Sequence, residues 1–292
     1  MEITAALVKE LRERTGAGMM DCKKALMETS ADLEAAIDLM RASGAAKAAK
    51  KSGRVASEGL VNLTVSDDNK NAVILEVNSE TDFVTKGSAF IDFVDALGSL
   101  ALKNKPESLE AFLSQTLGSG ETVDEARQGI IAKIGENISV RRLQIVTTEN
   151  GVLGAYKHGE RIAVLTVLSG SDDELAKDIA MHIAASKPEC VSEDQLSSEL
   201  VEREKAIFVG QAKESGKPDN IIEKMVVGRM KKFVKEVTLY GQAFVKDPDT
   251  TVGALVKSKG AEVESFIRYE VGEGMEKKED NFVEEVMAQA QA

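Results

Sequence analysis

The chain has 292 residues, of which 43% are hydrophobic and 29% are charged, a balance typical of folded domains and not of disordered chain. Asp and Glu (49) outnumber Lys and Arg (37), and the resulting net charge of −12 disfavours direct binding to nucleic acid or to an anionic membrane surface. Two cysteines far apart in sequence and two histidines provide no zinc motif, so we expect no metal site and a reducing, cytoplasmic compartment. No segment approaches the roughly 20 apolar residues that a membrane span needs.

The first 50 or so residues show the pattern of three short helices. Thr4 is a candidate N-cap, and Gly16 is a candidate stop for the first helix. The third helix should begin after residues 30–32 and end at Ser43–Gly44, so the Ala/Lys-rich stretch 45–51 is interpreted as a linker. Three short helices bury little surface, and we expect this module to be only marginally stable alone.

A β-hairpin followed by a helix occurs twice in the middle of the chain. The first copy has β-rich runs at 60–65 and 72–77, helical patterns at 90–100 and 126–134, and a strand at 139–146. The second copy has strands at 151–156 and 163–168 and a helix at 175–185. This recurrence predicts an α+β core made of two repeated β-hairpin-plus-helix halves.

The two copies differ in the connection between hairpin and helix. In the first copy, residues 78–89 connect the hairpin to the first helical pattern. In the second copy, only residues 169–174 connect the hairpin to the helix. The longer connection contains Thr81-Asp82-Phe83-Val84. Either Thr81 or Asp82 caps a helix while Phe83 fills the core, or the added segment acts outside the fold.

The last third of the chain predicts further helices and a returning strand. Two amphipathic helical patterns within residues 192–235 are joined by Gly216-Lys217-Pro218, which predicts an antiparallel helical hairpin. Residues 265–271 should form a strand that returns to the core, and residues 280–287 should form a short terminal helix.

Motifs of covalent or metal chemistry are not found in the sequence. We find no phosphate-binding loop, dinucleotide fingerprint, zinc-protease helix or nucleophile elbow. His182 lies in an apolar helical pattern and is interpreted as a packed residue, and His158 lies in a predicted turn. Met19 and Met20 follow a glycine-rich loop and are either core of the helical module or a soft docking surface.

Two long motifs resemble the signatures of the bacterial elongation factor Ts family. They are residues 11–26, LRERTGAGMMDCKKAL, and residues 76–84, EVNSETDFV. The resemblance continues through 133–138, KIGENI, and 266–274, FIRYEVGEG. It covers essentially the whole chain, with one visible departure at Ala243, where the family often has proline.

The resemblance implies a fold and a function. The fold would have an N-terminal three-helix, UBA-like module with its linker (1–54), two core halves (55–140 and 141–274) and a C-terminal module (275–292). The helical hairpin would be an insertion at about 190–235 in the second half. The function would be guanine-nucleotide exchange on the translational GTPase elongation factor Tu, without enzymatic catalysis and without a cofactor of its own. The chain would bind the GDP form, disturb the Mg²⁺ and phosphate site, and allow GTP to rebind.

Site residues follow from the same resemblance. Thr81, Asp82, Phe83 and Val84 would intrude near the Mg²⁺ of the GTPase, and Leu11, Met19 and Met20 would form a docking face. The N-terminal module and the C-terminal helix would contact the nucleotide-binding domain, and the second core half another domain. Self-association would use the helical hairpin. A small-molecule enzyme and a purely structural coiled-coil adaptor remain the competing hypotheses.

Overall fold

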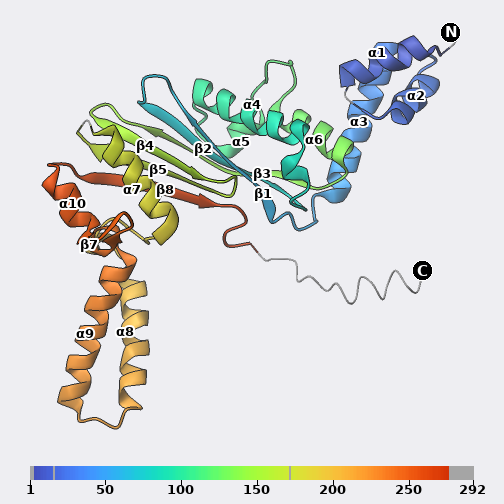
Figure 1. Cartoon of the computed structure of the whole chain (residues 1–292). Coiled ribbons are helices and arrows are strands. Elements are labelled where there is room, and N and C mark those ends of the chain that lie inside the picture. The colour runs from blue at the N-terminus through green and yellow to red at the C-terminus, as the bar shows by residue number, and fades with distance from the viewer. Residues whose placement is uncertain (1–2, 16, 171, 276–292) are drawn as a thin grey trace. The chain divides into compact units, whose positions relative to one another are not determined.

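The computed structural model describes residues 3–15, 17–170 and 172–275, and it confirms a mixed α+β fold (Figure 1). Contacts divide the chain into two compact units. One contains residues up to 62, residues 75–144 and the described residues from Glu270 on, and the other contains residues 63–74 and 145–269. The tip of the first hairpin is thus grouped with the second unit, a division that sequence periodicity does not predict.

The N-terminal module consists of α1 (Ala5–Thr15), α2 (Met19–Glu28) and α3 (Leu33–Lys51). The Thr4 hydroxyl accepts a hydrogen bond from the Leu7 N–H, which confirms the predicted N-cap. Asp32 caps α3 in the same way through the Ala35 N–H at 3.0 Å. The predicted stop at Gly16 lies outside the described residues. The small core of the module is built from Leu11, Cys22, Ala25, Leu26 and Ala36.

Helix α3 does not end at Ser43–Gly44, so the linker predicted over residues 45–51 is wrong. The helix continues to Lys51 and packs along α6 (Val123–Ile134), with Gly44 and Ala48 buried. A Cβ atom at Gly44 would lie 3.7 Å from the Cβ of Ala132, an ordinary van der Waals distance, so this site on the α6 side has room for a methyl group. Tertiary packing therefore outweighs the low helix propensity of glycine.

The first core half has the predicted hairpin of β1 (Glu58–Val65) and β2 (Asn71–Ser79), and β3 (Ile138–Thr147) completes a sheet in the order β1-β2-β3. Between β2 and β3 the chain forms η1 (Val84–Lys86), α4 (Ser88–Asn104), α5 (Leu109–Leu113) and α6. Phe90, Phe93 and Leu97 recur on the buried face of α4, as their spacing predicts. The turn of the hairpin is closed by a hydrogen bond from Ser66 N–H to the Asn71 carbonyl.

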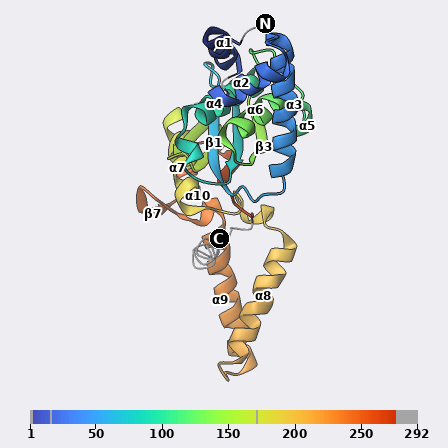
Figure 2. The same ribbon diagram turned by 90° about the vertical axis from the view of Figure 1, so that its right-hand side faces the viewer.

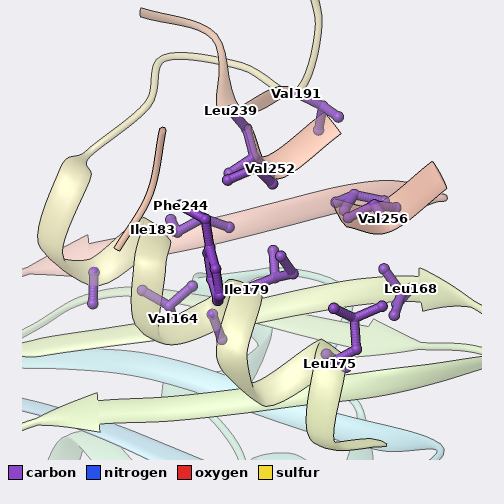
Figure 3. Packing of buried hydrophobic residues seen from close by; sticks show 14 of the residues in the cluster. Val164, Leu168, Leu175, Ile179, Ile183, Val191, Leu239, Phe244, Val252 and Val256 are labelled. Carbon is purple, nitrogen blue, oxygen red and sulfur yellow. The ribbon is translucent and has the colours of Figure 1, made fainter. Parts of the chain in front are cut away.

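The second core half repeats this plan. Strands β4 (Gly151–His158) and β5 (Ile162–Ser169) pair antiparallel, with Val152 opposite Leu168, and β8 (Val263–Glu270) extends the sheet in the order β4-β5-β8. Helix α7 (Asp173–Ser186) packs on β4 and β5. Figure 3 shows the core of this half, where Ile179 and Ile183 of α7 lie among Val164 of the sheet and Phe244. The two halves confirm the predicted repeat, and β8 confirms the predicted returning strand.

The predicted helical hairpin is present as α8 (Ser198–Lys213) and α9 (Asp219–Val237), preceded by η2 (Glu193–Gln195). The two helices lie side by side in Figures 1 and 2 and bury a small apolar cluster centred on Ala212, Ile222 and Val226. Backbone hydrogen bonds close the root of the hairpin, from Glu189 N–H to the Val237 carbonyl and from Leu239 N–H to the Cys190 carbonyl.

The remaining described elements are short. They are η3 (Leu239–Gly241), β6 (Ala243–Phe244), β7 (Asp247–Thr251) and α10 (Val252–Ser258). The predicted helix at 280–287, and with it the C-terminal module, lies outside the described residues. Among the helices of the described ranges, none combines the length and the apolar character needed to cross a membrane.

Candidate functional site

The segment that joins β2 to α4 carries the four residues Thr81-Asp82-Phe83-Val84. It runs from residue 80 to residue 87, whereas residues 170–172 are enough to join β5 to α7 in the second half. The structure therefore confirms that the first half contains an added segment at this point of the repeat. The segment includes the single turn η1, whose N-cap position is Phe83.

The Phe83 side chain is 78% exposed, which excludes the interpretation that it fills the core. The Lys86 ammonium lies 5.8 Å from the centre of its ring and 3.6 Å from the Asp82 carboxylate, so a short charged pair flanks the aromatic group. Val84 differs from its neighbours because it is buried, at 8% exposure. Val84 packs inward beneath the segment, so its side chain is not available to a partner. The predicted partner contact of Val84 is therefore corrected.

Hydrogen bonds hold the added segment in one conformation. The Glu136 carboxylate accepts the Thr81 N–H at 2.9 Å through Oε2 and the Thr81 hydroxyl at 2.7 Å through Oε1. The Ser79 hydroxyl, at the end of β2, donates to the Thr81 carbonyl, and within the segment the Thr85 hydroxyl donates to the Asp82 carbonyl. The exposed ring of Phe83 thus lies between Thr81, which is hydrogen-bonded to Glu136, and Thr85, whose hydroxyl closes the turn onto Asp82.

A second acidic residue ties the start of the segment to the same neighbouring turn. Glu80 Oε1 accepts the Asn137 N–H at 2.6 Å, and Glu80 Oε2 lies 3.5 Å from the Arg54 guanidinium. The buried Asn137 amide donates to the Arg54 carbonyl at 2.8 Å. Sequence reasoning did not identify Glu80, Glu136 or Asn137 as site residues. All three lie in the motifs 76–84 and 133–138, but a pairing of residues more than 50 positions apart leaves no local signal.

The docking face predicted in the N-terminal module combines two exposed methionines with one buried leucine. Met19 and Met20, at the start of α2, are 60% and 74% exposed, and Met27 of the same helix is 63% exposed. Leu11 is fully buried in the core of the module. It stabilises the three helices from within, so its placement on the docking face is wrong.

Comparison with known proteins gives a full-length match. A family model described as Elongation factor TS matches residues 80–273. Elongation factor Ts of Ruthia magnifica is 70% identical over 291 residues, 100% of this chain and 98% of the relative. Elongation factor Ts of Methylococcus capsulatus is 58% identical over 292 residues, 100% of both chains. The chain belongs to the elongation factor Ts family. Its membership assigns it to the elongation step of translation.

The two histidines of this elongation factor Ts family member differ in their surroundings: one is buried and hydrogen-bonded, and the other is exposed. His182 is fully buried on α7, where its Nδ1 accepts the Val245 N–H at 3.2 Å and its Nε2 lies 2.9 Å from the Gln242 amide oxygen. The Gln242 amide nitrogen donates to two backbone carbonyls, so its oxygen faces the imidazole and the ring is neutral with the proton on Nε2. Burial lowers the pKa of His182. His158 is exposed at the end of β4, where it pairs with Ile162, so its predicted place in a turn is wrong; its Nδ1 lies 3.3 Å from the Tyr156 hydroxyl.

A buried carboxylate in the first unit is also fully engaged. Glu76 accepts hydrogen bonds from Arg141, Arg142, Asn78 and the Gly272 N–H. Burial by itself raises the pKa of Glu76, but the bonds from Gly272, Asn78 and Arg142 together lower it below the ordinary value. This ionised group fastens β3 and the residues after β8 to β2, and it has no access to a substrate. Within the described ranges, no group of three or more His, Cys, Asp or Glu residues could hold a metal ion.

Proposed function

We propose that the chain is a guanine-nucleotide exchange factor for elongation factor Tu. It binds the GDP form of the GTPase, disturbs the Mg²⁺ and phosphate site, and leaves an empty site to which GTP binds. The observation that carries this proposal is the exposed Phe83 on a segment that the repeated fold does not need. A folded chain has no internal reason to hold a large aromatic ring in water on a segment fixed by hydrogen bonds.

The mechanism follows from how GTPases hold their nucleotide. Mg²⁺ and backbone N–H groups bind the phosphates, so a side chain that displaces either one lowers the affinity for GDP. Phe83 supplies an apolar wedge, and Asp82 supplies a negative charge that competes with the phosphates for Mg²⁺ and for N–H donors. No covalent bond is made or broken, so the chain needs neither a catalytic residue nor a cofactor of its own.

Thermodynamic coupling sets the size of the effect. A factor that prefers the nucleotide-free GTPase must weaken GDP binding by the same ratio, because coupling between two ligands is reciprocal. Burial of one phenylalanine is worth about 1.5–3 kcal/mol, which corresponds to about 10- to 150-fold. A larger effect requires the rest of the interface, and the exposed Met19 and Met20 of α2 are the residues we assign to docking.

Further features of the proposed function concern the partners and the compartment. The net charge of −12 argues against direct contact with nucleic acid or with an anionic membrane, and the cytoplasm is the place where translation occurs. Self-association is assigned to the helical hairpin α8–α9, which exposes Ile207, Ile221 and Val227. The C-terminal module and the second core half are assigned to further contacts with the GTPase.

A stopped-flow measurement of GDP release tests the proposal. Elongation factor Tu loaded with a fluorescent GDP analogue is mixed with excess GDP and increasing concentrations of this chain. We expect the release rate to rise with concentration and then to saturate. An unchanged rate in the presence of a bound chain would favour the structural adaptor, and turnover of a small molecule without any GTPase would favour an enzyme.

A further inference from the structure

The turn between α6 and β3 lies at the foot of the segment that carries Phe83. Helix α6 is capped at its C-terminus by Gly135, which has a φ of +88°, a left-handed conformation that glycine adopts without strain. The Lys51 ammonium donates to the Gly135 carbonyl, so the last residue of α3 caps the end of α6. The turn then presents Glu136 and Asn137, one after the other, to residues 80 and 81.

Both oxygens of Glu136 are used by one residue. Thr81 donates its N–H to one oxygen and its hydroxyl to the other, at 2.9 and 2.7 Å. Hydrogen bonds to an ionised acceptor are shorter and stronger than neutral ones, and two of them from a single residue fix its orientation as well as its position. The single hydroxyl donor of Thr81 is therefore already used within the chain. Phe83, two residues further along, is left exposed.

The same turn also anchors the end of α3. Asn137 donates its N–H to Glu80 and its side-chain amide to the Arg54 carbonyl, and Arg54 is paired with Glu80. Three consecutive residues of the turn thus bind both the root of the Phe83 segment and the residues that follow α3. Loss of one of these bonds removes one attachment of the segment and leaves the Phe83 side chain itself unchanged.

We propose that Glu136 is a positioning residue for nucleotide exchange, which acts by holding Thr81 so that Phe83 enters the partner in a fixed orientation. This inference rests on the proposed function. The Glu136 carboxylate touches neither GDP nor Mg²⁺, and its contribution is preorganisation. A segment that is ordered before binding does not lose conformational freedom when the complex forms, so more of the interaction energy goes into displacing the nucleotide.

The chain contains a matched control for this role. At the start of α6, the Glu125 carboxylate accepts the Thr122 N–H at 2.8 Å and the Thr122 hydroxyl at 3.0 Å, both through Oε2, so a threonine offers it the same two donors that Thr81 offers to Glu136. Glu125→Ala therefore removes a carboxylate that accepts two hydrogen bonds from a threonine, at the other end of the same helix. An effect of Glu136→Ala that comes only from loss of stability should be reproduced by Glu125→Ala.

The experiment is a double-mutant cycle that compares the wild type, Glu136→Ala, Phe83→Ala and the double variant. The measured quantity is the rate of GDP release from elongation factor Tu at a saturating concentration of the exchange factor. We expect Glu136→Ala to slow release at least about tenfold, the equivalent of one hydrogen bond to a charged group. In the Phe83→Ala background, the same substitution should change the rate by less than about twofold, because the group that Glu136 positions is absent. Glu136→Gln, which keeps one acceptor, should restore part of the rate, and Glu125→Ala should leave the rate unchanged.

Several outcomes overturn the inference. Equal slowing by Glu136→Ala in both backgrounds would show that it does not act through Phe83, and an unchanged rate would show that it does not act at all. Should Glu136→Ala fail to fold, Thr81→Val provides the same cycle, since it removes one of the two bonds and keeps the carboxylate. Normal release by Phe83→Ala alone would overturn the proposed function together with the inference, whereas slow release by Phe83→Ala with normal release by Glu136→Ala would overturn the inference alone.

Discussion

Truncation of Phe83 should separate exchange from folding. Because the side chain is 78% exposed, Phe83→Ala removes almost no buried apolar surface, and the free energy of unfolding should fall by less than about 1 kcal/mol. The loss of its contact with the Lys86 ammonium, 5.8 Å from the ring, is a minor term at an exposed site. The fold of the first half therefore remains intact in this variant.

Exchange should respond strongly to the same change. If Phe83 is buried in the complex with elongation factor Tu, its truncation costs about 1.5–3 kcal/mol of coupling, and GDP release should slow by about 10- to 150-fold. Asp82→Ala should slow the same step through the loss of its charge near Mg²⁺. The assay pairs the melting temperature with the stopped-flow release rate on the same samples.

Phe90 provides the matched control, since it lies seven residues further along and is fully buried on α4. Phe90→Ala should cost about 3–5 kcal/mol of stability, as core phenylalanines do. Each correctly folded molecule of this variant should still promote GDP release from elongation factor Tu at the normal rate. The reasoning is refuted if Phe83→Ala melts like Phe90→Ala while its exchange rate per folded molecule is unchanged.

Four further predictions follow from the structure. Met20→Ala should weaken binding to the GTPase with little change in melting temperature, whereas Leu11→Ala should cost about 2–5 kcal/mol of stability because Leu11 is fully buried, and urea titration together with a binding assay tests both. Gly44→Ala should stabilise the chain by up to about 1 kcal/mol through helix propensity, whereas Gly44→Leu should destabilise it by crowding α6. If thermal unfolding shows that the two variants lose stability equally, the packing described for α3 is contradicted. The pKa of His182 is lower in the folded chain than in the unfolded chain, so the unfolded state takes up the proton first as the pH falls. Stability should therefore decrease as the pH drops below about 6.5. The dependence of melting temperature on pH in this range should be weaker in His182→Gln. Replacement of the hairpin within 192–235 by a short loop should spare cooperative unfolding and change sedimentation, and a molten, aggregating product would show that the hairpin belongs to the core.

The elements whose residues contact near neighbours in sequence could be read from the sequence alone. The β-rich runs at 60–65 and 72–77, separated by a polar turn signal at 66–70, predicted the first hairpin. The spacing of Phe90, Phe93 and Leu97 predicted α4 in the same manner. The unequal connections of the two repeats also identified the segment with Phe83, since a length difference needs no structure to be seen.

Only the tertiary structure decided where particular residues lie relative to these elements. Sequence periodicity treats Leu11 as one apolar residue of a small helix and Gly44 as a helix stop, yet packing buries the first and continues the helix through the second. The pairing of Glu136 with Thr81 joins residues 55 positions apart, and that of Glu80 with Asn137 joins residues 57 apart. Local propensity is set by contacts within a few residues, whereas burial and hydrogen-bond partners are set by which surfaces meet when the whole chain has folded. The sequence alone thus located the segment that carries Phe83, and the fold determined that the ring is exposed and which residues hold it there.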